Sequence, residues 1–224
     1  MYFSYNPISN KIIYLEQINK KNKNVYICML DNWQYDGKSL RKIDLTNREK
    51  QFVLGTLLGN GSIIMPKNSL SPHLQIRESI NKGGNWLRCK AEELKRFSRQ
   101  KSFISDKDSF RWNSITNECW RYYFELCYKN KKKKITLEWL DQLQDIGITA
   151  WFIDKGQIFA NHCHIRVSRL CKDSLETLQE YFQIIEIPCS LKKHGGSMVV
   201  HFEKKETEKL IRLIGPCFPN YLKS

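Results

Sequence analysis

An internal repeat is the feature of this sequence that most constrains its fold. From Thr46 onward the hydrophobic pattern predicts a helix, two strands, a helix, two strands and a helix, and the same order then returns. Thr46 and Glu49 form a capping box that begins the first helix, and Asn60-Gly61 ends it. This duplication predicts an α+β fold of two pseudo-symmetric αββαββα halves, residues 46–134 and 135–224, whose strands join in one saddle-shaped sheet.

The predicted elements of the two halves correspond in order. After the helix that Thr46 begins, the first half has strands at 62–65 and 73–79, a helix at 86–98, strands near 103 and at 110–114, and a helix at 117–128. The second half has a helical region at 137–155 that breaks at Gly147, strands at 157–160 and 164–169, a helix at 173–185, strands at 189–193 and 197–202, and a helix at 206–214.

Residues 1–45 differ from the rest and are predicted to form a small appended β-hairpin element. Two strand-like segments, 11–17 and 24–30, flank a polar turn at 19–22. The sequence does not indicate what this element does. Binding of a protein partner through residues 1–45 is one possibility that it leaves open.

The chain is strongly basic, with 37 Lys and Arg against 23 Asp and Glu and a formal net charge of +14. A nucleic acid suits such a chain, because each neutralised phosphate releases condensed counterions. The alternative is a lysine bias from an AT-rich genome. No apolar run approaches the roughly 18 residues of a membrane span, and the N-terminal residues do not resemble a secretory signal. We therefore expect a soluble protein of the cytoplasm, an organelle or a nucleoid, without a membrane partner.

The eight cysteines contain no C-x-x-C pair, so neither a disulfide framework nor a zinc site is predicted. The run His162-Cys163-His164 contains metal-ligating residue types. Neighbouring side chains in a strand point to opposite faces, however, so these three are not expected to converge on a metal.

Two segments, each at the end of the first long helix of its half, carry a resemblance to a known family. Leu54–Gly61 (LGTLLGNG) aligns with Thr149–Gly156 (TAWFIDKG), and the small residues Gly55 and Ala150 fall at the same position. Small residues at helical spacing let two backbones approach closely. The segments resemble the paired LAGLIDADG motifs of single-chain, monomeric homing endonucleases, and the resemblance covers most of the chain after residue 45.

The resemblance implies that the two motif helices pack across a pseudo-dyad and that each ends in an acid that holds a divalent metal at a scissile phosphate. This chain has Asn60 and Lys155 at those positions, so its catalytic site is predicted to be degenerate. Mg²⁺ favours carboxylate ligands, whereas Asn60 is neutral and the Lys155 ammonium repels a metal. Asp154 lies one residue earlier, about 100° round the helix. No cofactor is therefore expected, and Mg²⁺ is expected only if Asp154 restores a site and cleavage is retained.

The resemblance also implies a lysine near this centre after the last helix of each half. Lys134 and Lys223 occupy these places, although Lys134 ends a run of four lysines that solvent exposure alone would explain. Together with Lys155 they would gather positive charge that suits holding a phosphate without cutting it.

Alternation of polar and apolar residues predicts a polar face on the strands. In the resembled family this face lies along the major groove of DNA, where each base pair presents a distinct pattern of donors and acceptors. Any half-exposed sheet alternates in this way, but the outward residues here include no acid. The predicted DNA-binding residues are His73, Gln75, Arg77, Ser79, Arg111, Asn113, His164, Arg166, Ser168 and Lys192.

The sequence therefore predicts a protein that binds a specific site in double-stranded DNA, with cleavage lost or greatly reduced, in an intron or another mobile element. An active metal-dependent endonuclease or nickase is one alternative. An intron maturase that binds folded RNA is another, although RNA recognition favours stacking aromatics, which the predicted outward positions lack.

Overall fold

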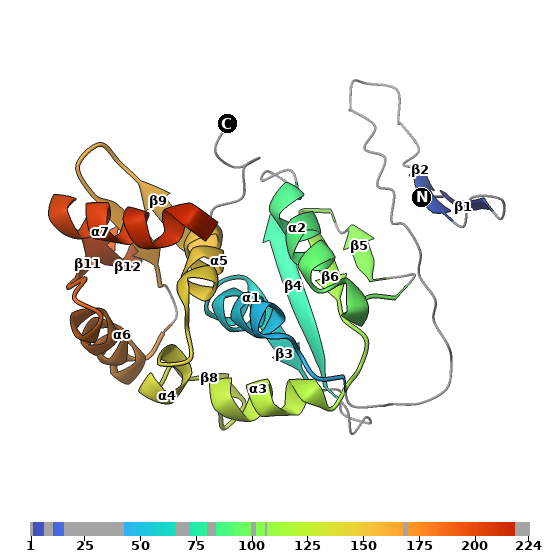
Figure 1. Cartoon of the computed structure of the whole chain (residues 1–224), viewed down its shortest axis with the longest axis horizontal. Helices are drawn as coiled ribbons and strands as arrows, with labels where there is room; N and C mark the ends of the chain where they lie inside the picture. Colours follow the sequence, from blue (N-terminus) through green and yellow to red (C-terminus); the bar gives the residue numbers. More distant parts are fainter. Residues whose placement is uncertain are drawn as a thin grey trace. The chain divides into compact units, whose positions relative to one another are not determined.

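The computed structural model describes residues 2–6, 11–15, 43–65, 72–79, 84–99, 102–105, 107–167 and 170–217 (Figure 1). The chain divides into two units, Met1–Ser39 and Leu40–Ser224. In the smaller unit, β1 (Tyr2–Asn6) pairs antiparallel with β2 (Lys11–Leu15). The strand predicted at 11–17 is confirmed, but it pairs with β1; the expected partner at 24–30 lies outside the described residues.

The first half of the larger unit follows the predicted order of elements. These are α1 (Asn47–Leu58), β3 (Gly61–Ile64), β4 (His73–Ser79), α2 (Asn85–Glu93), a 3₁₀ helix (Lys95–Phe97), β5 (Phe103–Ser105), β6 (Ser109–Asn113) and α3 (Cys119–Cys127). The strands form an antiparallel sheet of order β3-β4-β6-β5. A short hairpin of β7 (Tyr128–Lys129) and β8 (Lys132–Lys133) then leads to the second half.

The second half repeats this topology. Its elements are α4 (Leu137–Leu140), α5 (Asp145–Lys155), β9 (Gly156–Ile158), β10 (Cys163–Arg166), α6 (Lys172–Ile184), β11 (Ser190–His194), β12 (Ser197–Phe202), α7 (Lys204–Ile214) and a 3₁₀ helix (Gly215–Cys217). The strands of the second half form a sheet of order β9-β10-β12-β11. When α5 is matched with α1, this is the same order as β3-β4-β6-β5 in the first half. The repeat is therefore confirmed by strand pairing. In the described residues, however, strand hydrogen bonds stay within each half, which gives two sheets where one joined sheet was expected.

The first motif helix, α1, begins at a capping box formed by Thr46 and Glu49. The Thr46 side chain accepts from the Glu49 N–H at 3.2 Å, and the Glu49 carboxylate accepts from the Thr46 N–H at 2.7 Å, so the predicted capping box is confirmed.

The predicted helix break at Gly147 is wrong. The chain leaves the helix between α4 and α5, and Gly147 lies inside α5, where its missing side chain makes room for Gln51.

Close contact between α1 and α5 joins the two halves of the larger unit, and the helices lie side by side in Figure 1. A Cβ on Gly55 would overlap the backbone of Gly147, and a Cβ on Gly59 would overlap the side chain of Asp154. Small residues let the helix backbones meet. The C-terminal ends of the two motif helices therefore lie together, as the paired motifs predict.

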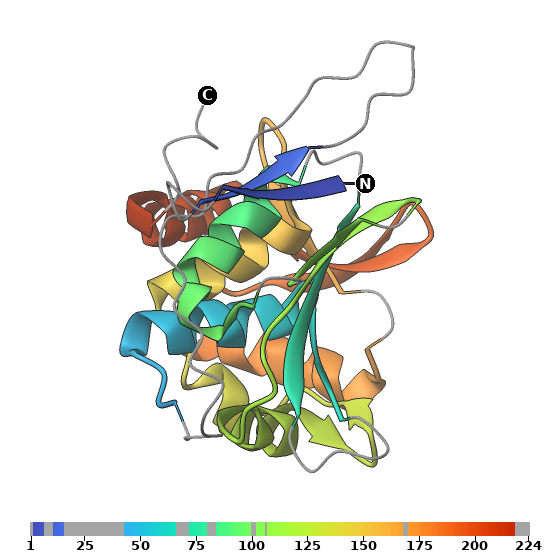
Figure 2. The same cartoon turned by 90° about the vertical axis from the view of Figure 1, so that its right-hand side faces the viewer.

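Each sheet packs one face against helices, which Figure 2 shows on one side of the strands. The inward side chains form the core and are fully buried: Leu74, Ile76 and Trp112 in the first sheet, and Ile165, Val200 and Phe202 in the second. The polar side chains are thereby directed to the opposite face of each sheet. In the described part of the chain, no helix is both long and apolar enough to cross a membrane.

Candidate functional site

Asp154 is the centre of a buried polar cluster where α1 and α5 end. Its side chain is fully buried and forms an ion pair with Lys90 of α2, with Lys90 Nζ at 2.5 Å and 2.6 Å from the two carboxylate oxygens. Trp86 Nε1 donates to Oδ1 at 2.8 Å, and the Asn60 N–H donates to Oδ2 at 2.9 Å. Both oxygens of Asp154 are therefore engaged by donors from α1 and α2.

The sequences of the two motif helices explain why an acid fits at this position. Gly59 of α1 matches Asp154 of α5, and the absence of a side chain at Gly59 leaves room for the carboxylate. Lys90 reaches the carboxylate from the buried side of α2, with Nζ 5.1 Å from the centre of the Trp86 ring. A buried carboxylate without a cation is strongly destabilising. The ion pair therefore makes Asp154 a structural residue of the contact between the halves.

Lys133 places a second cation at the C-terminal end of α1. Its Nζ donates to the Leu57 carbonyl at 2.6 Å and to the Gly61 carbonyl at 2.9 Å. Burial of the ammonium group lowers the pKa of Lys133 to about 8, and the nearby charge of Lys155 acts in the same direction. Lys133 is therefore mostly protonated at neutral pH, where it also complements the partial negative charge of the helix end.

The lysines named from the sequence lie at different places. Lys155 is the last residue of α5 and is half-buried. Lys134 lies away from α1, in a solvent-exposed ion pair at 3.2 Å with Asp173 of α6. Neighbouring residues of an extended chain point to opposite sides, so Lys133 and not Lys134 faces α1. Lys223 lies outside the described residues.

The residues at the two motif ends do not fit a divalent metal. Hard cations take several oxygen ligands and favour carboxylates, but Asn60 is uncharged, Lys155 is cationic and Asp154 is bound by Lys90. Within the described ranges, no three His, Cys, Asp or Glu side chains are grouped to hold a metal ion. The charges of Lys90 and Asp154 cancel, and Lys133 and Lys155 bring two further cationic groups to the motif ends. This arrangement attracts an anion and repels a cation.

The polar face of the first sheet has the alternation that the sequence predicts. In β4, His73, Gln75, Arg77 and Ser79 are partly or fully exposed and alternate with the buried Leu74, Ile76 and Glu78. Arg111 and Asn113 of β6 lie opposite Arg77 and Gln75. Gln75 Nε2 donates to Asn113 Oδ1 at 3.0 Å, and Arg77 Nε donates to Gln75 Oε1 at 3.0 Å. These bonds hold the amide and guanidinium groups next to one another.

The polar face of the second sheet differs from its prediction in three respects. Arg166 is exposed as expected, but only 1% of His164 is exposed, because other rings cover it. Lys192 forms an ion pair with Glu203 at 2.8 Å, so an acid does lie beside this face. Phe159 adds an aromatic ring that the list of outward residues lacked. Ser168 lies outside the described residues.

Two groups of residues were missed from the sequence, although each leaves a signal there. Lys90 lies on the apolar side of α2 with Trp86, Leu87 and Ala91, and a lysine in such a stripe indicates a buried anionic partner. His162 and His164 are two residues apart and so share one face, but the two histidines that join them, His194 and His201, come from another hairpin. Strand register, which the sequence did not supply, brings these four together.

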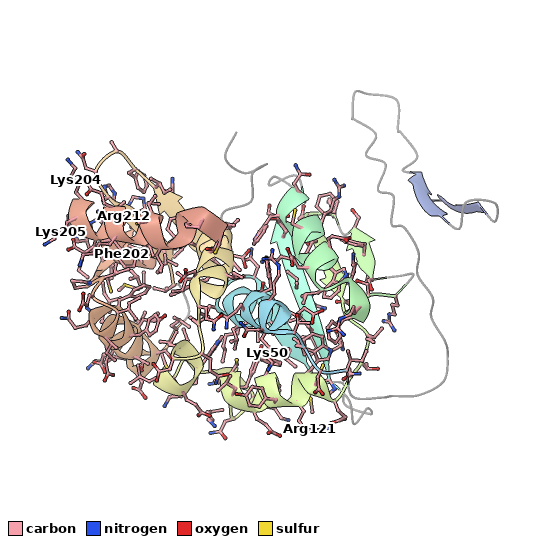
Figure 3. All side chains as sticks on the ribbon, in the orientation of Figure 1. Lys50, Arg121, Phe202, Lys204, Lys205 and Arg212 are labelled. Atoms are coloured by element: carbon pink, nitrogen blue, oxygen red, sulfur yellow. The ribbon has the colours of Figure 1, made fainter. Side chains whose placement is uncertain are left out.

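Basic residues also lie on the helices, as the labelled side chains in Figure 3 show: Lys50 of α1, Arg121 of α3, and Lys204, Lys205 and Arg212 of α7. The net charge of the chain therefore does not by itself locate a binding face. The location rests on the polar side chains of the sheets and on the cations at the motif ends.

Comparisons with known proteins agree with this architecture. Residues 50–210 match the model of the LAGLIDADG DNA endonuclease family. The homing endonuclease I-WcaI, solved bound to its DNA recognition sequence, is similar with a TM-score of 0.72 and 17% identity over 81% of this chain and 86% of that one. I-DmoI, solved in complex with DNA and Mn, is similar with a TM-score of 0.51 and 12% identity over 75% of this chain and 96% of that one. No curated protein sequence matches the chain.

Proposed function

The chain belongs to the LAGLIDADG DNA endonuclease family, and on this premise we propose that it binds a specific site in double-stranded DNA without metal-dependent cleavage. The polar faces of the two sheets would lie along the major groove, with the motif ends over the phosphates between the two half-sites. Homing endonucleases of this fold have been solved with DNA, I-WcaI with its recognition sequence and I-DmoI with DNA and Mn.

The charge at the motif ends is the observation that supports the loss of cleavage. A metal site in this fold needs free acidic oxygens, and both oxygens of Asp154 are bound by Lys90. The ammonium groups of Lys133 and Lys155 repel a metal and attract a phosphate. The alternative in which Asp154 restores a metal site would require the buried ion pair with Lys90 to break, which is costly.

The residue types on the polar faces support recognition of base edges. Arginine donates two hydrogen bonds to guanine, and asparagine or glutamine pairs with adenine in the major groove. Arg77, Gln75 and Asn113 supply these groups from adjacent strands of the first sheet. Binding of folded RNA is the alternative, and Phe159 with the imidazoles around it offers rings on which RNA bases can stack. The arginine and amide side chains of the first sheet favour base edges in duplex DNA instead.

Selection from a random duplex library tests the proposal. We expect a long asymmetric sequence to be enriched, because the two halves present different side chains to their half-sites. Binding should weaken steeply with salt, since each neutralised phosphate adds about 0.9 to the slope of log K against log salt. A folded RNA competitor should displace the duplex poorly. Failure to enrich any duplex, or preferential binding of the RNA, would overturn the proposal.

Replacing Arg77 by glutamine should cost about 1–3 kcal/mol of binding free energy and relax the preference at one base pair. The matched control is Arg212→Gln on α7, an exposed arginine on the helical surface that should leave the preferred sequence unchanged. Fluorescence anisotropy with the selected duplex and with single-base variants measures both effects. Equal losses for the two variants would contradict the placement of the DNA on the sheet face.

A further inference from the structure

Four histidines gather around Phe159 on the second sheet. His162 stacks on Phe159 with ring centres 4.5 Å apart, and the rings of His164 and His194 lie 5.1 Å and 6.0 Å from the Phe159 ring. His164 and His194 are 4.8 Å apart, and His162 and His201 are 4.9 Å apart. We call these five residues the histidine surface.

The histidine surface lies on the polar face of the sheet. His164 of β10 pairs with His201 of β12, and directly paired residues of antiparallel strands point to the same side. Two positions along, Arg166 and Lys192 both pair with Val199, which places them on that side as well. The adjacent core residues point the other way. The imidazoles therefore share a face with the two basic residues proposed to contact DNA.

The groups around the imidazoles are mostly cationic. Arg166 and Lys192 are basic, while Glu203 is the acid that faces the surface, 3.2 Å from His201 Nε2 and 2.8 Å from Lys192 Nζ. Burial lowers the pKa of His164, with further lowering by His194 and Arg166, and burial together with Lys192 lowers the pKa of His201. In the free protein both imidazoles are therefore held neutral at neutral pH.

His164 has an unsatisfied polar atom at the centre of this surface. Among the described residues its Nε2 is buried without a hydrogen-bond partner, and the side chain is flanked by the rings of Phe159 and His194. A buried polar atom in this condition is destabilising. A proton on the imidazole would make both ring nitrogens donors, and a neighbouring anion would then satisfy the charge.

We propose that the histidine surface contacts the DNA backbone and takes up protons as it binds, so that the second half holds its half-site more tightly as the pH falls. This inference rests on the proposed function. A DNA phosphate adds negative charge beside Arg166, Lys192 and the four imidazoles, where Glu203 already pairs with His201 and Lys192. The charged form of histidine is thus favoured in the complex and disfavoured in the free protein. Histidine is suited to this role because its charge changes near physiological pH.

The direction of the effect follows from this difference. At pH values between the histidine pKa in the free protein and the higher pKa in the complex, binding takes up protons. For each proton taken up, the affinity then rises about tenfold for every unit by which the pH falls. Each protonated histidine that neutralises a phosphate also steepens the salt dependence by about 0.9. Neutral histidines that merely pack against one another would produce neither change.

The test measures the affinity of the full chain for the selected duplex at about pH 6 and about pH 8, at fixed ionic strength. We expect tighter binding and a steeper salt slope at the lower pH. The variant His164→Gln cannot take up the proton, and His194→Gln removes the ring that lies against His164, so both should flatten the pH dependence. His194 is exposed, so its replacement should preserve folding even if the buried His164 variant does not fold. Arg212→Gln, on the helical surface, is the control and should keep the pH slope.

The possible outcomes separate this inference from the proposed function. Duplex binding that is independent of pH, or a pH slope that is unchanged in His194→Gln, overturns the inference and leaves DNA binding intact. Absence of duplex binding at both pH values overturns both. Calorimetric titration in two buffers of different ionisation enthalpy counts the protons directly, and a count of zero would also overturn the inference.

Discussion

Replacing Lys90 by methionine should lower the free energy of unfolding by about 3–5 kcal/mol, because it leaves the Asp154 carboxylate buried without a counter-charge. Lys90 is 1% exposed and contacts both oxygens of Asp154, so solvent cannot replace it. Urea denaturation at neutral pH measures the loss.

A second substitution distinguishes a lost charge partner from lost packing. Adding Asp154→Asn to Lys90→Met removes the buried charge and keeps one oxygen, which can accept from either the Asn60 N–H or Trp86 Nε1. We expect most of the stability to return. Lys95→Met, which breaks an exposed pair with Glu92, should change stability little. A double variant as unstable as Lys90→Met alone would show that the packing of the lysine stem, and not its charge, stabilises this region.

Replacing Gly55 by alanine should also be strongly destabilising. The added Cβ would overlap the carbonyl of Gly147, so α1 and α5 would have to move apart along the contact that joins the two halves. Overpacking of this kind costs about 1–3 kcal/mol, and more where the neighbouring atoms are backbone. Thermal denaturation measures the effect.

Gly215→Ala provides the matched control for the helix contact. Among the described residues, an added Cβ at Gly215 meets no atom within 4 Å, and Gly215 already has helical backbone angles. Its replacement should be neutral or slightly stabilising, because alanine restricts the unfolded chain more than glycine does. Equal stability of the Gly55 and Gly215 variants would mean that the two motif helices are not packed as closely as the structure describes.

Much of the fold was predictable because hydrophobic alternation and capping act locally. The strands His73–Ser79 and Ser197–Phe202 have the predicted bounds, and Thr46 begins α1 as its capping box requires. The break expected at Gly147 rests on the low helix propensity of glycine. Here the contact with another helix, which no local pattern reveals, explains the glycine.

The candidate site was predictable only in part, because its chemistry depends on contacts between distant residues. Asn60 and Lys155 could be named from the aligned motifs, but the partner of Asp154 lies 64 residues away in α2. The resemblance implies Lys134, as a lysine after the last helix of the first half, whereas the alternation of β8 directs Lys133 to the end of α1. Similarly, no spacing indicates that His194 meets His164, since their contact depends on the register of three strands.

Incubation of the selected duplex with the protein and Mg²⁺ or Mn²⁺ is the most direct test of the central claim, which is specific binding without metal-dependent cleavage. Denaturing gels of both labelled strands would be read beside a binding measurement on the same samples. We expect the duplex to be bound and both strands to remain intact with either metal. A break or nick at a fixed position in either strand would contradict the account, because it would require a metal site where Lys90, Lys133 and Lys155 place positive charge.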